Sequence, residues 1–389
     1  MNFEFISSTR LIFGPGTFSK AGAIASGFGK RALVTYGVPS TVLGDISANL
    51  NQAGLEVFDL QVQTEPTIEL IQKGLALARQ NNCDVIIGLG GGSAIDTGKA
   101  IAALTTNPGD LYNYLEVIGK GQPILNPSAP FIAIPTTAGT GAEVTSNAVI
   151  SAELPDHPGR KIKVSLRSPS MQARLAILDP MLTLDLPASV TASTGLDALT
   201  QLIEPYVSNR ANPMTDALCC EGMQRASIAL RNAYFDGKDV AARENMLLAS
   251  LFSGIALANA KLGAVHGFAA PIGGLYSASH GAVCARLLPL VMQTNIHALN
   301  ERQKESHVIR RYQQVAQFLT GKPDASAEDG VFWVQSLVTE LKIPGLSEYG
   351  MTAGDIADIV PQAARASSMQ GNPIKLTDAE LSDILYQAL

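Results

Sequence analysis

The chain has 389 residues, of which 46% are hydrophobic and 16% charged, with a net charge of −6 at pH 7 and a pI near 5.4. This composition supplies enough apolar side chains for sizeable cores and excludes a disordered chain. The negative charge and the lack of a dense Lys/Arg run argue against nucleic acid as the main partner. At roughly 150 residues per domain, the length predicts two domains.

The N-terminal segment and the cysteines indicate the compartment. Met1–Arg10 has no basic region and no long apolar run, so we expect no signal peptide. No uninterrupted apolar stretch reaches the roughly 18–20 residues of a membrane helix, so we expect no membrane partner. The four cysteines, Cys83, Cys219, Cys220 and Cys284, form no C-x-x-C pair. We therefore expect small buried cysteines in a cytoplasmic protein.

Short apolar runs alternate with helical patterns up to about residue 185. The predicted strands are Ala32–Tyr36, Val57–Leu60, Asp84–Leu89, Phe131–Pro135 and Leu175–Leu178. Each run is bounded by Gly, Pro, Asn or Asp, and its apolar character suits a strand buried on both faces of a parallel sheet. Thr67–Gln80 has the apolar spacing of a helix. This alternation predicts a doubly wound α/β domain over residues 1–185.

Strand patterns fade after Leu186–Pro187. The predicted helices are Ala188–Val207, Pro213–Tyr234, Ala241–Ala260, Ile309–Leu319 and Ala327–Leu341. We therefore expect an all-α domain over residues 186–389. The most obvious loop is Leu154–Arg160, which contains two prolines and a glycine.

Two polar, glycine-bearing segments follow predicted strands. Gly90–Ser93 lies between the strand Asp84–Leu89 and the helical sequence Ala94–Thr105. Glycines let the backbone approach a phosphate closely, and the free N–H groups of a helix start point at it. Pro135–Thr145 brings threonine hydroxyls to the end of the next strong strand. Each segment alone is compatible with an ordinary turn, but two at strand ends favour a site for a pyrophosphate and a carboxamide.

These segments resemble motifs of the iron-containing (group III) alcohol dehydrogenase family, within the dehydroquinate synthase-like superfamily. Gly90–Lys99 is similar to G-G-G-S-x-x-D-x-x-K, and Pro135–Thr145 is similar to P-T-T-A-G-T-G-S-E-V-T. The resemblance runs from Arg10–Gly14 to Asn372–Pro373. It implies an NAD(P)-binding α/β domain, a helical catalytic domain and a divalent metal in the cleft between them.

The resemblance also implies which residues hold the cofactor. Lys163 falls where the family has a cofactor-side lysine. The predicted cofactor-binding residues are Gly37, Ser40, Gly90, Gly91, Gly92, Ser93, Asp96, Thr136, Thr137, Thr140, Thr145 and Lys163.

The turn after the first predicted strand bears on the choice of cofactor. An acidic residue near the end of such a strand bonds the ribose hydroxyls of NAD and repels the 2′-phosphate of NADP. Thr35–Ser40 carries no acid, and its Gly37 and Ser40 resemble those of NADP-using members of the family. We therefore predict NADP, with NAD as the alternative.

Two histidines and an aspartate resemble the metal-binding residues of the family. His266 and His280 lie fourteen residues apart in a stretch rich in small residues. One histidine in apolar sequence is more often a core residue, but a pair in this context favours a metal. Asp197 lies in a run that resembles the family's G-x-D-A-x-x-H helix, in which positions i and i+4 share a face.

The chain departs from the family at two positions of this site. Gln201 stands where most members have the histidine of that helix, and Ala270 stands where many have a histidine that handles the substrate proton. The predicted ligands are therefore Asp197, Gln201, His266 and His280, and Asp197 with the two histidines is the predicted catalytic set. Because an amide oxygen is a weaker donor than imidazole, the metal, iron or zinc, would bind less tightly than in the family.

The predicted function is hydride transfer between NAD(P)H and an alcohol or aldehyde substrate, with the metal as Lewis acid. A homodimer or larger homo-oligomer is expected. Gln201 and Ala270 leave two alternatives: a metal-free or altered-metal reductase similar to maleylacetate reductases, and a degenerate cofactor-binding protein. A lyase similar to dehydroquinate synthase is disfavoured, because its basic phosphate-binding residues are not evident.

Overall fold

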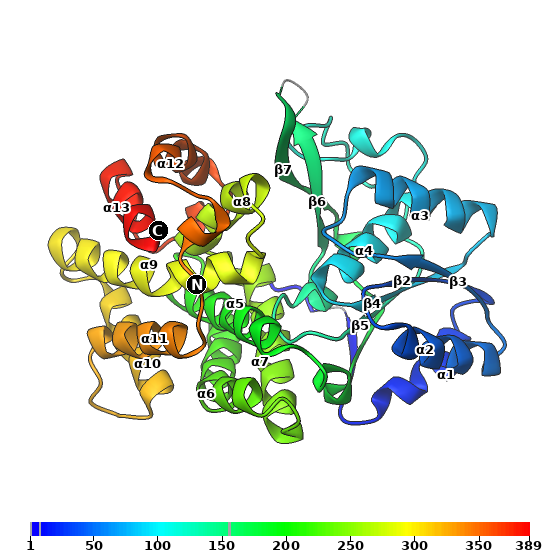
Figure 1. Cartoon of the computed structure of the whole chain (residues 1–389), viewed down its shortest axis with the longest axis horizontal. Coiled ribbons are helices and arrows are strands. Elements are labelled where there is room, and N and C mark those ends of the chain that lie inside the picture. The colour runs from blue at the N-terminus through cyan, green and yellow to red at the C-terminus, as the bar shows by residue number, and fades with distance from the viewer. Residues whose placement is uncertain (1, 8, 155–156) are drawn as a thin grey trace. The chain divides into compact units, whose positions relative to one another are not determined.

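A computed structural model describes residues 2–7, 9–154 and 157–389, and the side chains of residues 154–160 lie outside this description. The chain forms two compact units. The α/β unit comprises Ser7–Thr137 and Gly141–Leu184, and the helical unit comprises Met1–Ile6, Ala138–Thr140 and Asp185–Leu389. Figure 1 shows the strands and helices of each unit in chain order.

The α/β unit contains a six-stranded sheet in the order β1-β8-β5-β4-β2-β3. Every neighbouring pair of its strands is parallel. The strands are β1 (Arg10–Phe13), β2 (Arg31–Tyr36), β3 (Glu56–Gln61), β4 (Val85–Gly90), β5 (Phe131–Pro135) and β8 (Leu175–Leu178). All residues of β4, β5 and β8 are buried, as expected for strands covered on both faces.

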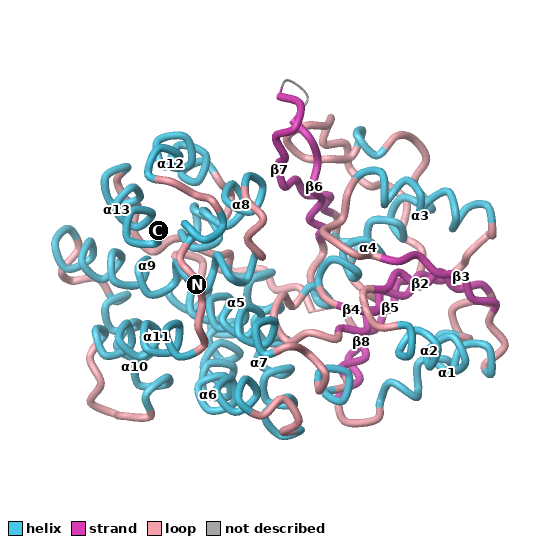
Figure 2. The backbone as a smooth tube through the Cα atoms, in the orientation of Figure 1, coloured by secondary structure: helices cyan, strands magenta, loops and turns pink. Residues whose placement is uncertain are grey.

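Helices cover the two faces of this sheet (Figure 2). On one face, α1 (Ala21–Ala25) and α2 (Ser40–Gln52) pack their apolar side chains against β2, β4, β5 and β8. On the other face lie α3 (Ile68–Gln80) and α4 (Gly92–Thr106). There the Thr35 hydroxyl of β2 donates to the Ala94 carbonyl of α4 at 2.9 Å. The three layers confirm the predicted doubly wound α/β fold.

The chain reverses its direction of travel across the sheet between β2 and β4. After β2 it adds β3 on one side, then returns to place β4 on the other side of β2. The segments that follow β2 and β4 therefore lead to helices on opposite faces of the sheet, α2 on one and α4 on the other. Open α/β sheets bind ligands at this switch point. The predicted segments Tyr36–Ser40 and Gly90–Ser93 lie at it, since Tyr36 and Leu89 are paired across the two strands.

A two-stranded antiparallel hairpin, which the sequence did not predict, also belongs to the α/β unit. It pairs β6 (Asn147–Leu154) with β7 (His157–Arg167). The predicted loop Leu154–Arg160 is thus shorter than expected, because the backbone from His157 onward is strand. Residues 155–156 lie outside the described residues.

The helical unit contains no strand among its described residues. Its helices are α5 (Ala188–Val207), α6 (Pro213–Phe235), α7 (Val240–Ala260), α8 (Ala264–Leu275), α9 (His280–Arg302), α10 (His307–Thr320), α11 (Ala327–Glu340), α12 (Ile356–Arg365) and α13 (Asp378–Ala388). The five predicted helices are present, and α8, α9, α12 and α13 are additional. By length and composition α7 would suffice to cross a membrane, but 56% of its apolar window is buried and a core helix passes the same test.

Candidate metal centre and cofactor segments

Four side chains from three helices of the helical unit converge on one point. Asp197 of α5, His266 of α8, and His280 and Cys284 of α9 each offer a donor atom, and these atoms all lie within 4.8 Å of one another. His280 is half-buried and the other three are buried. The sequence predicted three of these residues together, and the structure adds Cys284 to them.

The first turn of α9 carries two of the four donors. His280 and Cys284 are four residues apart, so their side chains leave the helix on the same face. Gly281 lets this turn approach α5 closely, because a Cβ at this position would overlap the Ser193 carbonyl. A larger residue at 281 would therefore move both donors away from Asp197.

The orientation of the His266 ring is fixed by a carboxylate. His266 Nδ1 lies 2.7 Å from Glu204 Oε2, and the other oxygen of Glu204 accepts from the Val265 N–H at 2.7 Å. Because Glu204 is buried and acceptor-only when ionised, the proton of the neutral imidazole belongs on Nδ1. Nε2 therefore presents its lone pair to the cluster. Such a carboxylate behind a histidine is the usual support of a metal-ligating imidazole.

Each atom that faces the centre has a lone pair that it can donate to a metal ion. Asp197 Oδ1 is buried, makes no regular hydrogen bond, and lies 3.4 Å from His266 Nε2 and 3.8 Å from His280 Nε2. The Cys284 Sγ lies 3.8 Å and 3.7 Å from the same two nitrogens. A buried carboxylate is stabilised by a positive charge close to it, which a protonated imidazole or a metal ion can supply. The residues therefore fit a divalent metal ion, whose usual protein donors are these nitrogen, oxygen and sulfur atoms.

The ionisation of the cluster leads to the same conclusion. Burial opposes ionisation of Asp197, but His280 and His266 outweigh it and hold the pKa of Asp197 below its ordinary value. Burial also opposes protonation of His266, but Cys284, Glu204 and Asp197 raise the pKa of this imidazole well above its usual range. Burial raises the pKa of the Cys284 thiol to about 12. The centre thus attracts positive charge, which a metal ion would supply in place of a proton.

The two departures from the family pattern lie on the same helices. Gln201 is buried one turn after Asp197, and its Oε1 accepts a hydrogen bond from the Ser253 hydroxyl of α7 at 2.9 Å. Ala270 is half-buried one turn after His266 in α8. The structure therefore engages the Gln201 oxygen with a protein donor, and ligation by Gln201 stays a prediction.

The predicted cofactor segments meet at the carboxyl ends of β4 and β5. The Thr136 N–H donates to the Gly90 carbonyl at 3.0 Å, and the Thr137 side chain lies beside Gly91. Gly90 has a φ of +147°, and a Cβ there would lie 2.9 Å from that of Ala94. Gly91 caps α4, whose first N–H groups have no partner within the helix. The sequence between β4 and α4 thus forms a glycine turn with free N–H groups, which is the geometry that anion-binding turns use, and binding of the cofactor here stays a prediction.

The turn after β2 completes this edge of the sheet. The Gly37 N–H donates to the Leu89 carbonyl at 3.0 Å, and Ser40 is the first residue of α2 after Pro39. Ala138–Thr140 belong to the helical unit, where Gly139 packs against Thr194 of α5.

Other predicted cofactor residues take part in internal contacts. The buried Lys99 ammonium donates to Thr145 Oγ1 at 2.9 Å and pairs with Asp96 Oδ1 at 3.0 Å. The second Asp96 oxygen accepts from the Val149 N–H at 2.9 Å. Lys163 forms an ion pair with Glu65. Asp96 and Thr145 thereby hold the Thr136–Thr145 segment in place, and their contact with a cofactor stays a prediction.

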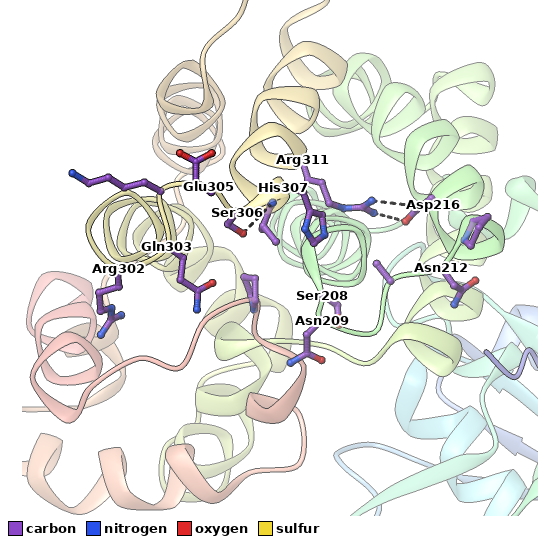
Figure 3. A pocket seen from close by; sticks show the side chains of 15 residues that line it. Ser208, Asn209, Asn212, Asp216, Arg302, Gln303, Glu305, Ser306, His307 and Arg311 are labelled. Carbon is purple, nitrogen blue, oxygen red and sulfur yellow. Dashed lines mark hydrogen bonds and ion pairs between the residues drawn. The ribbon is translucent and has the colours of Figure 1, made fainter. Parts of the chain in front are cut away.

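A surface cavity of about 900 Å³ in the helical unit is separate from this cluster. Figure 3 shows that it is lined by the turn after α5, the start of α6, and the segment that joins α9 to α10. Its Arg311 forms an ion pair with Asp216 and lies 4.1 Å from the centre of the Tyr206 ring. None of the four donors lines this cavity.

Cys284 and Glu204 are the two residues of the site that sequence reasoning did not single out. The spacing of each residue from a predicted ligand could have indicated it. Cys284 follows His280 by four residues, which is the same spacing that pointed from Asp197 to Gln201. Glu204 follows Asp197 by seven residues, which places it two turns further along the same helix face, in otherwise apolar sequence.

An anion-binding turn at the switch point of a doubly wound sheet and a buried cation site serve different parts of one reaction. The first is typical of dinucleotide binding, and the second polarises an oxygen of the substrate. A chain that contains both is a metal-assisted, nicotinamide-dependent oxidoreductase.

The comparisons with known proteins give the family. The model of the iron-containing alcohol dehydrogenase family matches residues 8–180, and the model of the C-terminal part of the Fe-containing alcohol dehydrogenase family matches residues 191–389. The chain belongs to the iron-containing alcohol dehydrogenase family. It transfers a hydride between a nicotinamide cofactor and a small alcohol or aldehyde with the help of a divalent metal.

Individual relatives cover almost the whole chain. A 1,3-propanediol dehydrogenase of Citrobacter freundii is 33% identical over 99% of this chain and 98% of its own length. An NAD-dependent methanol dehydrogenase of Bacillus methanolicus is 32% identical over 97% of each chain. The crystal structure of a 1,3-propanediol oxidoreductase superposes with a TM-score of 0.89 at 33% identity and covers 100% of both chains.

Proposed function

We propose that this chain is an NADP-preferring alcohol dehydrogenase or aldehyde reductase whose divalent ion is held by Asp197, His266 and His280. One observation carries the assignment of the ligands. Asp197 Oδ1 is buried without a regular hydrogen bond and faces the Nε2 atoms of both histidines at 3.4 and 3.8 Å. A buried carboxylate in this position is stabilised by a cation close to it.

Each protein group has a separate task in this proposal. Asp197 supplies the negative charge of the centre, and the two imidazoles supply neutral nitrogen donors. Glu204 is a positioning residue, because it holds the Nδ1 proton of His266 and so keeps Nε2 free. When bound, the ion would act as a Lewis acid on the substrate oxygen while the nicotinamide carries the hydride.

Because Ala270 replaces a histidine of the family pattern, the substrate proton must follow another route in this chain. A methyl group one turn after His266 can neither donate nor accept a proton. The proton that accompanies hydride transfer must therefore travel through water, a cofactor hydroxyl or another side chain. We expect the rate to respond weakly to substitution of Ala270 by another small apolar residue.

The preference for NADP rests on the turn between β2 and α2. Tyr36–Ser40 contains no carboxylate, lies at the switch point, and leads into the N-terminus of a 13-residue helix. A helix N-terminus attracts a phosphate group, whereas an acid at this position would repel it. The NAD-dependent relative shows that both cofactors must be measured.

Gly37→Asp should shift the preference toward NAD by about tenfold or more, because it places a carboxylate where the 2′-phosphate would bind. A Cβ at Gly37 would lie 3.3 Å from the Val62 carbonyl, so a small local adjustment is needed. The measurement is kcat/KM with NADPH and with NADH at equal ionic strength. Gly37→Ala is the matched control, since it adds the Cβ without the charge. A wild-type preference for NADH would refute the proposal.

The proposed activity is tested with metal-reconstituted protein, NADPH and a series of simple aldehydes. We expect turnover that disappears on chelation and returns with a divalent ion. Turnover that persists without metal would favour the reductase similar to maleylacetate reductases. Cofactor binding without turnover of any aldehyde or alcohol would favour the degenerate cofactor-binding protein.

We also propose a cytoplasmic location and a homo-oligomeric state. The free state of all four cysteines supports a reducing compartment. Sedimentation of the purified chain would test the oligomeric state directly.

A further inference from the structure

We propose that Cys284, and not Gln201, supplies the fourth protein donor of the metal centre, so that the site binds zinc in preference to ferrous iron. This inference rests on the proposed function only in taking Asp197, His266 and His280 as ligands. The chain has lost a histidine at position 201 but has a thiol one turn after another ligand.

The separations between the four donors match those around a single ion. About a tetrahedral zinc, with Zn–S near 2.3 Å and Zn–N or Zn–O near 2.0–2.1 Å, neighbouring donors lie roughly 3.3–3.6 Å apart. In the structure the Cys284 Sγ lies 3.7 and 3.8 Å from the two histidine nitrogens, and Asp197 Oδ1 lies 3.4 and 3.8 Å from them. These four separations are within a few tenths of an ångström of the values around a zinc ion, and every pair of donor atoms lies within 4.8 Å.

The surroundings of the two rival donors differ. The Gln201 oxygen already accepts a hydrogen bond from the Ser253 hydroxyl at 2.9 Å, which occupies one of its two lone pairs and holds it toward α7. The Cys284 sulfur has long contacts to His266 and His280 and a contact to Asp197, and all three are members of the cluster. Ligation by Cys284 therefore competes only with long, weak contacts, whereas ligation by Gln201 competes with a hydrogen bond of regular length.

The charge of the donors also favours the thiol. On binding, the sulfur loses its proton to solvent and becomes a thiolate bonded to the ion. Asp197 and this thiolate would then be two anionic donors to the cation, whose attraction is strong in a buried place. Thiolates favour zinc, and zinc stands above ferrous iron in the general order of affinities.

The test uses cobalt(II) as a spectroscopic probe of the full chain. Metal is removed with a chelator, cobalt is added to one equivalent, and the near-ultraviolet spectrum is recorded. We expect a thiolate-to-cobalt charge-transfer band in the wild type that is absent from Cys284→Ala and Cys284→Ser. Cys219→Ala is the matched control, because Cys219 is also a fully buried helical cysteine but lies outside the cluster. It should keep the band.

Zinc affinity gives a second readout. Competition with a chromophoric chelator should show a loss of at least about 100-fold in Cys284→Ala and less than about tenfold in Gln201→Ala. Should the alanine variant fail to fold, Cys284→Ser keeps the size of the side chain and supplies the same comparison. The wild type should also bind zinc more tightly than ferrous iron.

The inference and the proposed function fail in different ways. A wild-type cobalt spectrum without the charge-transfer band, or a larger loss in Gln201→Ala than in Cys284→Ala, would overturn the role of Cys284 even if the metal form turns over aldehydes. A clear thiolate band in a protein without turnover would leave this inference standing and refute the dehydrogenase proposal. Absence of any metal binding would overturn both.

Discussion

The cofactor segments and the metal centre reach their geometry by different means. At the switch point of the sheet, the groups offered to a ligand are backbone N–H groups, placed by Gly90 and the start of α4. In the helical unit the offered groups are side-chain atoms from α5, α8 and α9. A backbone cradle depends on glycines at fixed positions, whereas a side-chain donor can come from any position that faces the same point. The first site therefore depends on an intact glycine motif, whereas the proposed exchange of Gln201 for Cys284 as a donor is possible at the second.

The largest expected effect removes the charge of the metal centre. Asp197→Asn keeps the shape of the side chain but removes the anionic oxygen that faces His266 and His280. We expect zinc affinity and kcat/KM to fall by at least about 100-fold, while NADPH binding is unchanged. Metal analysis, steady-state kinetics and cofactor fluorescence measure the three quantities. A parallel loss of NADPH binding would contradict the independence of the two sites.

The reciprocal change strains the backbone cradle. Gly90 has a φ of +147°, and a Cβ there would lie 2.9 Å from the Ala94 Cβ and 3.0 Å from the Gly37 nitrogen. Gly90→Ala should lower the free energy of unfolding by about 1–3 kcal/mol and weaken NADPH binding, without a change in zinc stoichiometry. Chemical denaturation and cofactor titration check this.

The control for Gly90→Ala is Gly44→Ala. Gly44 lies in α2, and nothing lies within 4 Å of a Cβ added there. This substitution should raise the free energy of unfolding by about 0.4–1 kcal/mol. Equal destabilisation by both substitutions would show that the φ of Gly90 is not the cause.

An effect confined to part of the pH range concerns a buried acid near Gly90. Glu143 is 2% exposed with Oε1 unpartnered, and burial raises its pKa to about 7 despite the nearby Lys99. The folded chain therefore holds this proton more tightly than the unfolded chain, so the free energy of unfolding should fall as the pH rises from about 4.5 to 7.

Glu143→Gln should remove that fall, and the variant should exceed the wild type by about 1–3 kcal/mol at pH 8 but not at pH 4.5. Denaturation midpoints at the two pH values test this. Glu305→Gln, at an exposed loop position, is the control and should follow the wild-type curve. A constant difference between Glu143→Gln and wild type at all pH values would contradict the assignment.

The sequence was sufficient for the parts of the fold that local patterns determine. The buried strands β4 and β5 read as continuous apolar runs, and the long helices α5, α6 and α7 read as apolar periodic sequence. The hairpin β6–β7 was missed because its prolines and glycine resemble a loop, while pairing across its two strands is a non-local property. Helix α8 was missed because it is rich in Gly and Ala and contains Pro271.

The contrast between local sequence patterns and non-local contacts also explains which residues of the metal site could be predicted. Asp197, His266 and His280 were predicted because they resemble a family pattern, and the structure brings them together. Cys284 was treated as one of four small buried residues, because a single cysteine has no distinctive sequence context. Only the close approach of α9 to α5 at Gly281 shows that its sulfur faces the same point as Asp197.

The arrangement of the four donors also makes the ion part of the architecture. The candidate donors come from three helices, and Asp197 and His266 are far apart along the chain. An ion bound only by the folded chain would act as a cross-link that closes this long loop, and its binding free energy adds to the stability of the helical unit. At a free metal concentration about 1,000 times Kd, this linkage amounts to about 4 kcal/mol. Depletion of metal would then lower the melting temperature together with the activity.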